Sequence, residues 1–367
     1  MRRLTPFTAL LIVILCSCGP APLAAQSIFD LLGGGRTDSA TEVTLRYATD
    51  SISAEQTAAQ PAELHFTDAA GNAQRFAPEV SVRGKFRRSR CGTPPLKLNF
   101  KKGELRRAGL REFDKYKLVG HCLDGPAGQS LVLREYLAYR AQALLVPHAF
   151  RVQLLRVTYV DAAADTVTNR AYAFLIEEND ELADRHGLTR LKDAAGHPAG
   201  DYLPRAEATN ALFQYLIANG DYSLPMGRNV KAYRSPAGPI IPVGYDFDFS
   251  GWVGAPYASP TRDIGQQSIY HRVYTGYAQS DSLLRDVAAD FFRQRRALLD
   301  LLRDFAPLPE ADRTTLVRFV RRGYDELGGV LHGDPAFSIY DRLRGSHSAV
   351  VPPGGLPPFY RSTGRRR

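Results

Sequence analysis

The chain has 367 residues, of which 44% are hydrophobic and 23% charged, and these values are ordinary for a globular protein with a sizeable core. Its formal net charge is +9, with arginines concentrated between residues 83 and 90 and at the C-terminus. No helix-turn-helix, zinc or RRM pattern accompanies this charge, so we expect no nucleic-acid partner. A phosphate-bearing ligand or simple solubility explains the excess equally well.

Residues 1–25 have the pattern of an export signal, because a basic start is followed by an apolar run and then by small residues. The apolar run, Ala9–Cys16, is too short for a transmembrane span. Two processing outcomes remain open. Cleavage before Gln26 is the preferred one, and a lipid anchor at Cys18 is the alternative. Both predict an exported protein that is periplasmic, at the cell surface or secreted.

The body of the chain keeps two cysteines, Cys91 and Cys122, after the signal is removed. An oxidising compartment favours a disulfide between them, and two free buried thiols are the alternative. The bond would close a loop of about 30 residues, for which chain-entropy estimates give roughly 3 kcal/mol of stabilisation.

The first half of the chain is rich in strand patterns. Residues 26–40 contain three consecutive glycines, which is typical of a linker. Within residues 96–100 apolar side chains alternate strictly with Lys97 and Asn99. One helix is expected over 130–145, where an apolar stripe is followed by a proline. The predicted strands are 41–47, 64–66, 79–83, 96–100, 115–119, 150–160 and 171–177. The pattern predicts a mostly antiparallel sheet with one inserted helix.

The second half of the chain has helical spacing of its apolar residues over 208–218, 281–305 and 310–331. The last residues, 346–367, are rich in Pro, Gly, Ser and Arg, and predict a disordered basic tail. We therefore expect a β-rich N-lobe over 41–180 and a helical C-lobe over 181–345.

The stretch from Asn219 to Gly251 is the strongest candidate for a functional site. Asp221 follows a helix end, and two apolar runs around a Pro/Gly turn predict a hairpin that begins at Asn229. Asp246 and Asp248 stand at the end of the second run and point to the same face. Carboxylate and amide oxygens suit Mg²⁺ or Mn²⁺, so the stretch predicts a metal site.

The order of these parts resembles the spore coat protein H-like (CotH) kinase family, an atypical branch of the protein-kinase-like fold, over roughly residues 78 to 255. The residues that carry the resemblance are Arg83-Gly84, Lys97, Leu133-Arg134-Glu135, Asp221, Asn229 and Asp246-Phe247-Asp248. The likeness is greatest to a secreted bacterial subgroup with paired cysteines and a motif like YDFDFSG. It implies an α+β, two-lobed fold with a β-rich N-lobe and a helical C-lobe.

The resemblance also implies roles for the site residues. Asp221 would orient or deprotonate the acceptor hydroxyl, and Asn229 would hold a metal ion. Asp246 would hold the metal that bridges the nucleotide phosphates, and Asp248 would be a second or alternative ligand. The metal would be Mg²⁺ or Mn²⁺, and ATP would be the phosphate donor.

Further residues would hold the phosphates. The resemblance places Lys97 on the α- and β-phosphates, steadied by Glu135 from the helix, and Arg83 lies in a basic loop that could pair with phosphate. The alternatives to Lys97 are Lys101, Lys102 and Lys117.

The implied function is a metal-dependent kinase that transfers phosphate from a nucleotide to a hydroxyl of an exported protein or glycan. One alternative is a non-catalytic, pseudokinase-like envelope protein that uses the same cleft to bind a ligand or partner. A sugar-nucleotide glycosyltransferase also fits the Asp246-Phe247-Asp248 motif, but that class requires a parallel βαβ sheet, which the sequence does not predict.

Overall fold

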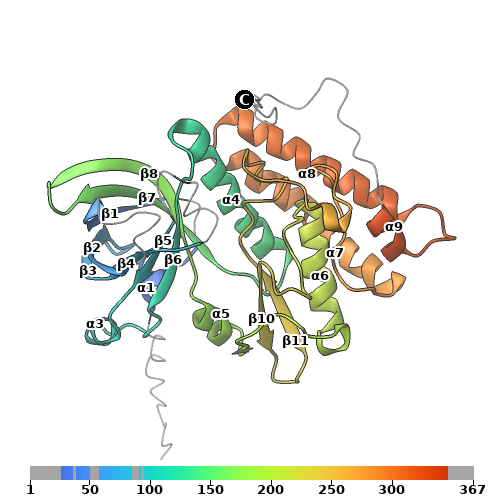
Figure 1. Cartoon of the computed structure of the whole chain (residues 1–367), viewed down its shortest axis with the longest axis horizontal. Coiled ribbons are helices and arrows are strands. Elements are labelled where there is room, and N and C mark those ends of the chain that lie inside the picture. The colour runs from blue at the N-terminus through green and yellow to red at the C-terminus, as the bar shows by residue number, and fades with distance from the viewer. Residues whose placement is uncertain (1–25, 36–38, 50–57, 85–90, 92–94, 346–367) are drawn as a thin grey trace, which may run out of the picture.

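Eight strands in the first half of the chain form one sheet (Figure 1), whose order is β1-β7-β8-β6-β5-β4-β2-β3. The computed structural model describes residues 26–35, 39–49, 58–84, 91 and 95–345. The strands are β1 (Thr41–Tyr47), β2 (Gln60–Thr67), β3 (Ala73–Phe76), β4 (Glu79–Val82), β5 (Leu96–Asn99), β6 (Lys115–Val119), β7 (Val152–Asp161) and β8 (Thr166–Ile176). Strand β1 pairs with β7 in parallel and with β2 in antiparallel fashion, which closes seven of the strands into a barrel, and β3 extends from β2.

The barrel interior is filled from the strands and from one short helix, α1 (Ile28–Leu31). Ile28 and Phe29 are completely buried, and the Phe29 ring stacks on Tyr116 with 6.3 Å between ring centroids. The guanidinium of Arg151 lies over the Phe29 ring, 5.1 Å from its centre. Helix α1 is thus the plug of the barrel. The segment 26–40, which we expected to be a linker, therefore contains part of the core.

Strands β7 and β8 are buried on both faces where they leave the barrel. Leu155 and Val157 point into the barrel core, whereas Val152 and Leu154 belong to the second core, which the helices form. Side chains of a strand alternate between its two faces, so the continuously buried residues at the start of β7 serve both cores at once. These strands join the barrel to the rest of the molecule.

Helices and a small sheet make up the remainder. Helix α4 lies between the barrel and the other long helices (Figure 1). The α-helices are α3 (Lys102–Arg107), α4 (Gly125–Leu145), α5 (Asn179–Arg185), α6 (Pro204–Leu216), α7 (Asp281–Asp304), α8 (Glu310–Leu331) and α9 (Ile339–Gly345). The small sheet has the order β11-β10-β9, with strands β9 (Thr189–Arg190), β10 (Val230–Arg234) and β11 (Ile240–Gly244).

The prediction of a two-lobed, kinase-like α+β fold with a β-rich N-lobe and a helical C-lobe is wrong. Strand β1 pairs at both of its edges, with β2 and with β7, and so closes the strands into a barrel. The closing pair joins residues more than a hundred positions apart, such as Val43 and Val157, and no local pattern in the sequence specifies such a pairing. The predicted signal at 1–25 and tail at 346–367 lie outside the described residues.

The predicted disulfide between Cys91 and Cys122 is confirmed, with the two Cα atoms 4.4 Å apart. It ties the chain just after the arginine-rich segment to the turn between β6 and α4. Among the residues that the structure describes, no helix is long and apolar enough to cross a membrane.

A buried carboxyl, that of Glu207 on α6, fastens the segment before α7. It accepts hydrogen bonds from the backbone N–H of Tyr277 at 3.0 Å and from Nε2 of Gln279 at 2.8 Å. Burial raises the pKa of Glu207 from its ordinary value of 4.5 to about 7. Between these two values the folded protein keeps a proton that the unfolded chain has released. Stability therefore falls as the pH rises through this window.

We predict that Glu207→Gln makes the protein more stable than wild type at pH 8, by roughly 1–3 kcal/mol. The amide needs no proton, and Gln279 can turn its own amide to accept a hydrogen bond from it. The difference should shrink towards pH 5, where the wild-type carboxyl is protonated when folded. Urea unfolding at both pH values measures it. Exposed Glu42→Gln is the control, and an equal response of both variants to pH would contradict the prediction.

Candidate metal and phosphate site

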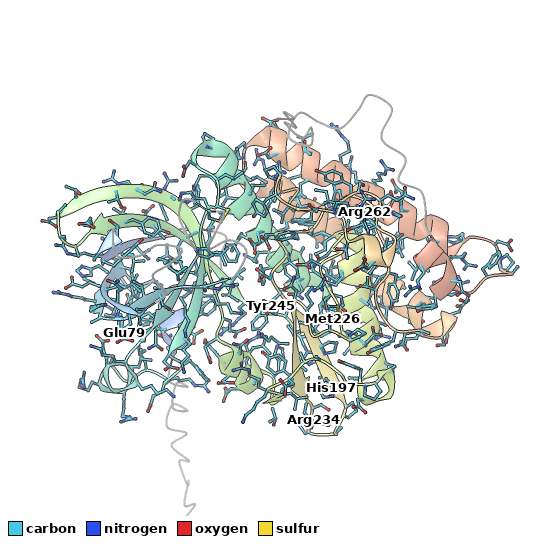
Figure 2. All side chains as sticks on the ribbon, viewed as in Figure 1. Glu79, His197, Met226, Arg234, Tyr245 and Arg262 are labelled. Atoms are coloured by element: carbon cyan, nitrogen blue, oxygen red, sulfur yellow. A yellow bond between two sulfur atoms is a disulfide. The ribbon has the colours of Figure 1, made fainter. Side chains whose placement is uncertain are left out.

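The predicted hairpin is present as β10 and β11, which pair in antiparallel fashion with Val230 opposite Gly244. One further backbone hydrogen bond, from Tyr245 N–H to Asn229 C=O at 3.0 Å, extends the ladder past the strand ends. Asn229 is thereby placed beside the residue that precedes Asp246. Figure 2 shows Tyr245 in the middle of the molecule, between the barrel and the helices.

Phe247 anchors the acidic pair. Its side chain is fully buried, with its ring centre 4.6 Å from that of Tyr139 and 5.6 Å from that of Phe213. The backbone N–H of Asp246 donates to the Tyr139 hydroxyl at 2.9 Å. Asp246 and Asp248, on either side of Phe247, lie beyond β11, which ends at Gly244, and Asp246 has a φ of 64°. The two carboxylates therefore converge through this irregular segment and not through the strand alternation that we expected.

Glu135, from α4, completes a cluster of three carboxylates with Asp246 and Asp248. One oxygen from each lies within 4.8 Å of the others, and the side chains of Glu135 and Asp248 are 3% exposed. Buried like charges this close repel one another strongly unless a proton or a cation balances them. Oxygen donors from three positions fit Mg²⁺ or Mn²⁺, so these residues are suited to hold the metal that the sequence predicted. Glu135, expected beside a lysine, is here a candidate metal ligand.

Asp221 and Asn229 form a second unit of the site. The Asn229 amide donates to the Asp221 carboxylate at 2.8 Å and to the Asp221 C=O at 2.9 Å. The backbone N–H of Asp221 donates to the side chain of Asn219 at 3.0 Å, which fixes the loop after α6. Arg228 approaches the same carboxylate at 3.5 Å. Burial raises the pKa of Asp221, and the hydrogen bond from Asn229 opposes that shift.

Two lysines, one from the barrel and one from the small sheet, line the site. Lys117 of β6 and Lys231 of β10 both pack on the ring of Tyr245, with their Nζ atoms 4.3 Å and 4.8 Å from its centre. Burial, then the positive charges of Arg83 and Lys231, lower the pKa of Lys117 to about 7, and Asp246 opposes this effect. Cations this crowded favour a polyanionic ligand such as a nucleotide polyphosphate.

Lys97, the lysine that the resemblance pointed to, lies directly opposite Lys117 in the pairing of β5 with β6. The two side chains therefore share one face of the sheet. Lys117 is on the strand nearer β8 and has the electrostatic contact with Asp246, so we regard it as the stronger candidate for phosphate binding. Arg83, which was also expected at the phosphates, directly follows β4. Its positive charge lowers the pKa of Lys117 and opposes the rise in the pKa of Tyr139.

Sequence reasoning did not single out Lys231, Tyr245 or Arg228. Lys231 stands two residues after Asn229 on an alternating strand, and this spacing could have placed it on the site face. Tyr245 opens the motif YDFDFSG, but nothing in that motif indicated a role for its ring, and Arg228 carries no distinguishing pattern. Only their contacts reveal their place in the site.

A scan against protein-family models gives no match for this chain, and no curated protein matches it. The resemblance to the CotH family therefore stays a prediction that rests on the residues named above.

We predict that Mn²⁺ stabilises the wild-type protein and that Asp248→Asn abolishes this effect. A ligand that binds only the folded state at a hundred times its Kd adds about 2.7 kcal/mol. Thermal unfolding with EDTA and with Mn²⁺ measures the difference between the two proteins. Asp263→Asn, at an exposed position, is the control, and an equal response to Mn²⁺ in both variants would refute the site.

We predict that Lys117→Met weakens the binding of inorganic triphosphate about tenfold or more, since a hydrogen bond to a charged group contributes roughly 1.5–3 kcal/mol. Lys97→Met is the matched variant, because it removes the same charge from the same sheet face. It should have the smaller effect. Isothermal titration calorimetry with Mg²⁺ present compares them, and the reverse order would make Lys97 the principal phosphate ligand.

Proposed function

We propose that this protein transfers the terminal phosphoryl group of a nucleotide, ATP, to a hydroxyl of an exported protein or glycan. The observation that carries the proposal is the convergence of Glu135, Asp246 and Asp248 beside lysines. The proposal rests on the chemistry of this site and is independent of the kinase-like fold, which the closed barrel overturns.

Phosphoryl transfer requires positioning and the neutralisation of charge more than covalent chemistry by the protein. Lys117 and Lys231, on the ring of Tyr245, offer two ammonium groups to the phosphate chain. Glu135, Asp246 and Asp248 would hold Mg²⁺ or Mn²⁺. When bound, this ion supplies positive charge to the phosphate oxygens.

Asp221 is the candidate general base. Its carboxylate is fixed by Asn229 and lies partly exposed, so an acceptor hydroxyl can reach it. In the proposed step the acceptor oxygen bonds to the terminal phosphorus, and the bond from that phosphorus to the bridging oxygen breaks. The acceptor proton passes to Asp221, and the nucleoside diphosphate leaves. Burial raises the pKa of Asp221, which makes its carboxylate a better proton acceptor.

The Cys91–Cys122 disulfide supports the exported location, because disulfides persist in oxidising compartments. Two processing outcomes are proposed for the N-terminus, cleavage before Gln26 and acylation of Cys18. Both keep α1, the plug of the barrel, because this helix begins at Ile28. Export places the acceptor among proteins or glycans outside the cytoplasm.

Hydrolysis of ATP, with water as the acceptor, tests the proposal without knowledge of the natural substrate. We predict that Asp246→Asn loses binding of Mn²⁺-ATP in calorimetry. Asp221→Asn should retain binding but lower the hydrolysis rate by about 10²–10⁴, the usual contribution of a general base. Asp263→Asn is the control for both measurements.

The outcomes separate the rival functions. Absence of Mn²⁺-ATP binding by the wild-type protein would refute the proposal. Binding without hydrolysis, and with equally small effects of Asp221→Asn and Asp246→Asn, would favour the non-catalytic envelope protein that binds a ligand in the same place.

A further inference from the structure

A cavity lies away from the carboxylates and lysines of the candidate site. Its volume is about 310 Å³, and it is enclosed by the C-terminal end of α4, the strand β11, the start of α6 and the middle of α7. None of its lining residues belongs to the phosphoryl site. Its size is at the lower end of the range for small-molecule sites, which is about 300–1,000 Å³.

The walls of the cavity are mostly apolar. Leu144, Leu145 and Val146 come from the end of α4, and Ile241 comes from β11. Leu203 borders the opening and is 37% exposed, which is unusual for a large apolar side chain in this protein. It occupies the N-cap position of α6, where Ser, Thr, Asp or Asn are preferred because they bond the first N–H groups. Leu203 cannot form the side-chain hydrogen bond that caps a helix, and it leaves apolar surface beside the cavity.

The rim of the cavity is positively charged. Asp290 of α7 forms ion pairs with Arg205 of α6 and with Arg293 of α7, and all three residues line the cavity. Two guanidinium groups share one carboxylate, so one positive charge remains. Arg205 and Arg293 are 52% and 68% exposed, and each has donors left for an anion from solvent.

From the apolar walls and the cationic rim we propose that this cavity binds a single-chain anionic amphiphile, with its chain against Leu145 and Ile241 and its carboxylate at Arg205 and Arg293. The occupant is a free small molecule and not a membrane surface. Membrane recognition through basic residues uses clusters of about 4–8 Lys or Arg, whereas this rim has two arginines and a neutralising aspartate.

Calorimetry with hexanoate, octanoate and decanoate, each below the concentration at which it forms micelles, tests the proposal on the whole protein. We expect saturable binding whose affinity rises about fourfold for each added methylene, the equivalent of about 0.8 kcal/mol per buried CH₂. Decanol, which has the same chain and no charge, should bind at least about tenfold more weakly, because it forms no charge-assisted hydrogen bond with arginine.

Two variants locate the ligand. Arg293→Glu reverses an exposed rim charge and should weaken decanoate binding about tenfold or more, with little change for decanol. Arg321→Glu makes the same charge change at an exposed position of α8 and should bind as wild type does. Absence of saturable binding, equal affinity for decanol, or an equal loss in both variants would overturn the proposal. Binding of Mn²⁺-ATP is read separately, so this result does not depend on the proposed kinase activity.

Discussion

The buried ion pair between Arg134 and Asp312 determines how α4 sits in the molecule, and the site depends on α4. The guanidinium and the carboxylate are 2.8 Å apart, and both side chains are 2% exposed. Removing one partner of such a pair typically costs about 3–5 kcal/mol, because the other charge is left buried. The pair holds α4 against α8 and fixes the rotation of α4 about its axis. The neighbouring residue, Glu135, is therefore directed at the acidic cluster.

The same arginine also ties α4 to the chain after Asp248. Arg134 donates to Val253 C=O at 3.2 Å, and the indole N–H of Trp252 donates to Arg134 C=O at 2.9 Å. Gln142, two turns further along α4, donates to Gly244 C=O at 3.0 Å. A Cβ at Gly244 would lie 2.4 Å from the amide nitrogen of Gln214, so a larger residue there would displace that side chain. The helix and the hairpin thus approach closely at both ends of the segment that carries the carboxylates.

Backbone conformation at the site is strained in two places. Asn229 and Asp246 have φ angles of 52° and 64°, in the left-handed region that Asn and Asp enter more readily than most residues. Such conformations cost of order 1–3 kcal/mol each and persist where the surrounding contacts hold them. At Asp246 one such contact is the hydrogen bond that its backbone N–H donates to the Tyr139 hydroxyl. At Asn229 the contacts are the two hydrogen bonds that its side-chain amide donates to Asp221. Their coincidence with the polar cluster is consistent with a functional origin of the strain.

Local sequence patterns were sufficient to predict many of the individual strands and helices. They were not sufficient to predict how these elements pack together. Alternation and helical spacing predicted strand 41–47, strand 115–119 and helix 310–331 with the bounds that the structure has, and they predicted the hairpin that carries Asp246. The closure of the barrel by β1 and β7 and the plug formed by α1 depend on contacts between distant parts of the chain. A glycine-rich segment gives no local sign that Phe29 is buried.

The same holds for the site: some of its residues could be found from local sequence patterns, and others only from contacts between distant parts of the chain. The sequence predicted that Asp246 and Asp248 point to the same side, but the segment after β11 that brings them together is not extended, and the third carboxylate comes from α4. Both depend on tertiary contacts. The sequence left the choice between Lys97 and the alternatives Lys101, Lys102 and Lys117 open. In the structure Lys97 and Lys117 are paired on β5 and β6, and the charge of Asp246 acts on Lys117. The barrel contributes Lys117, and the hairpin contributes Asp246. The positive and the negative charge therefore come from separate parts of the fold. The two cores that meet along β7 and β8 fix the position of these parts relative to each other.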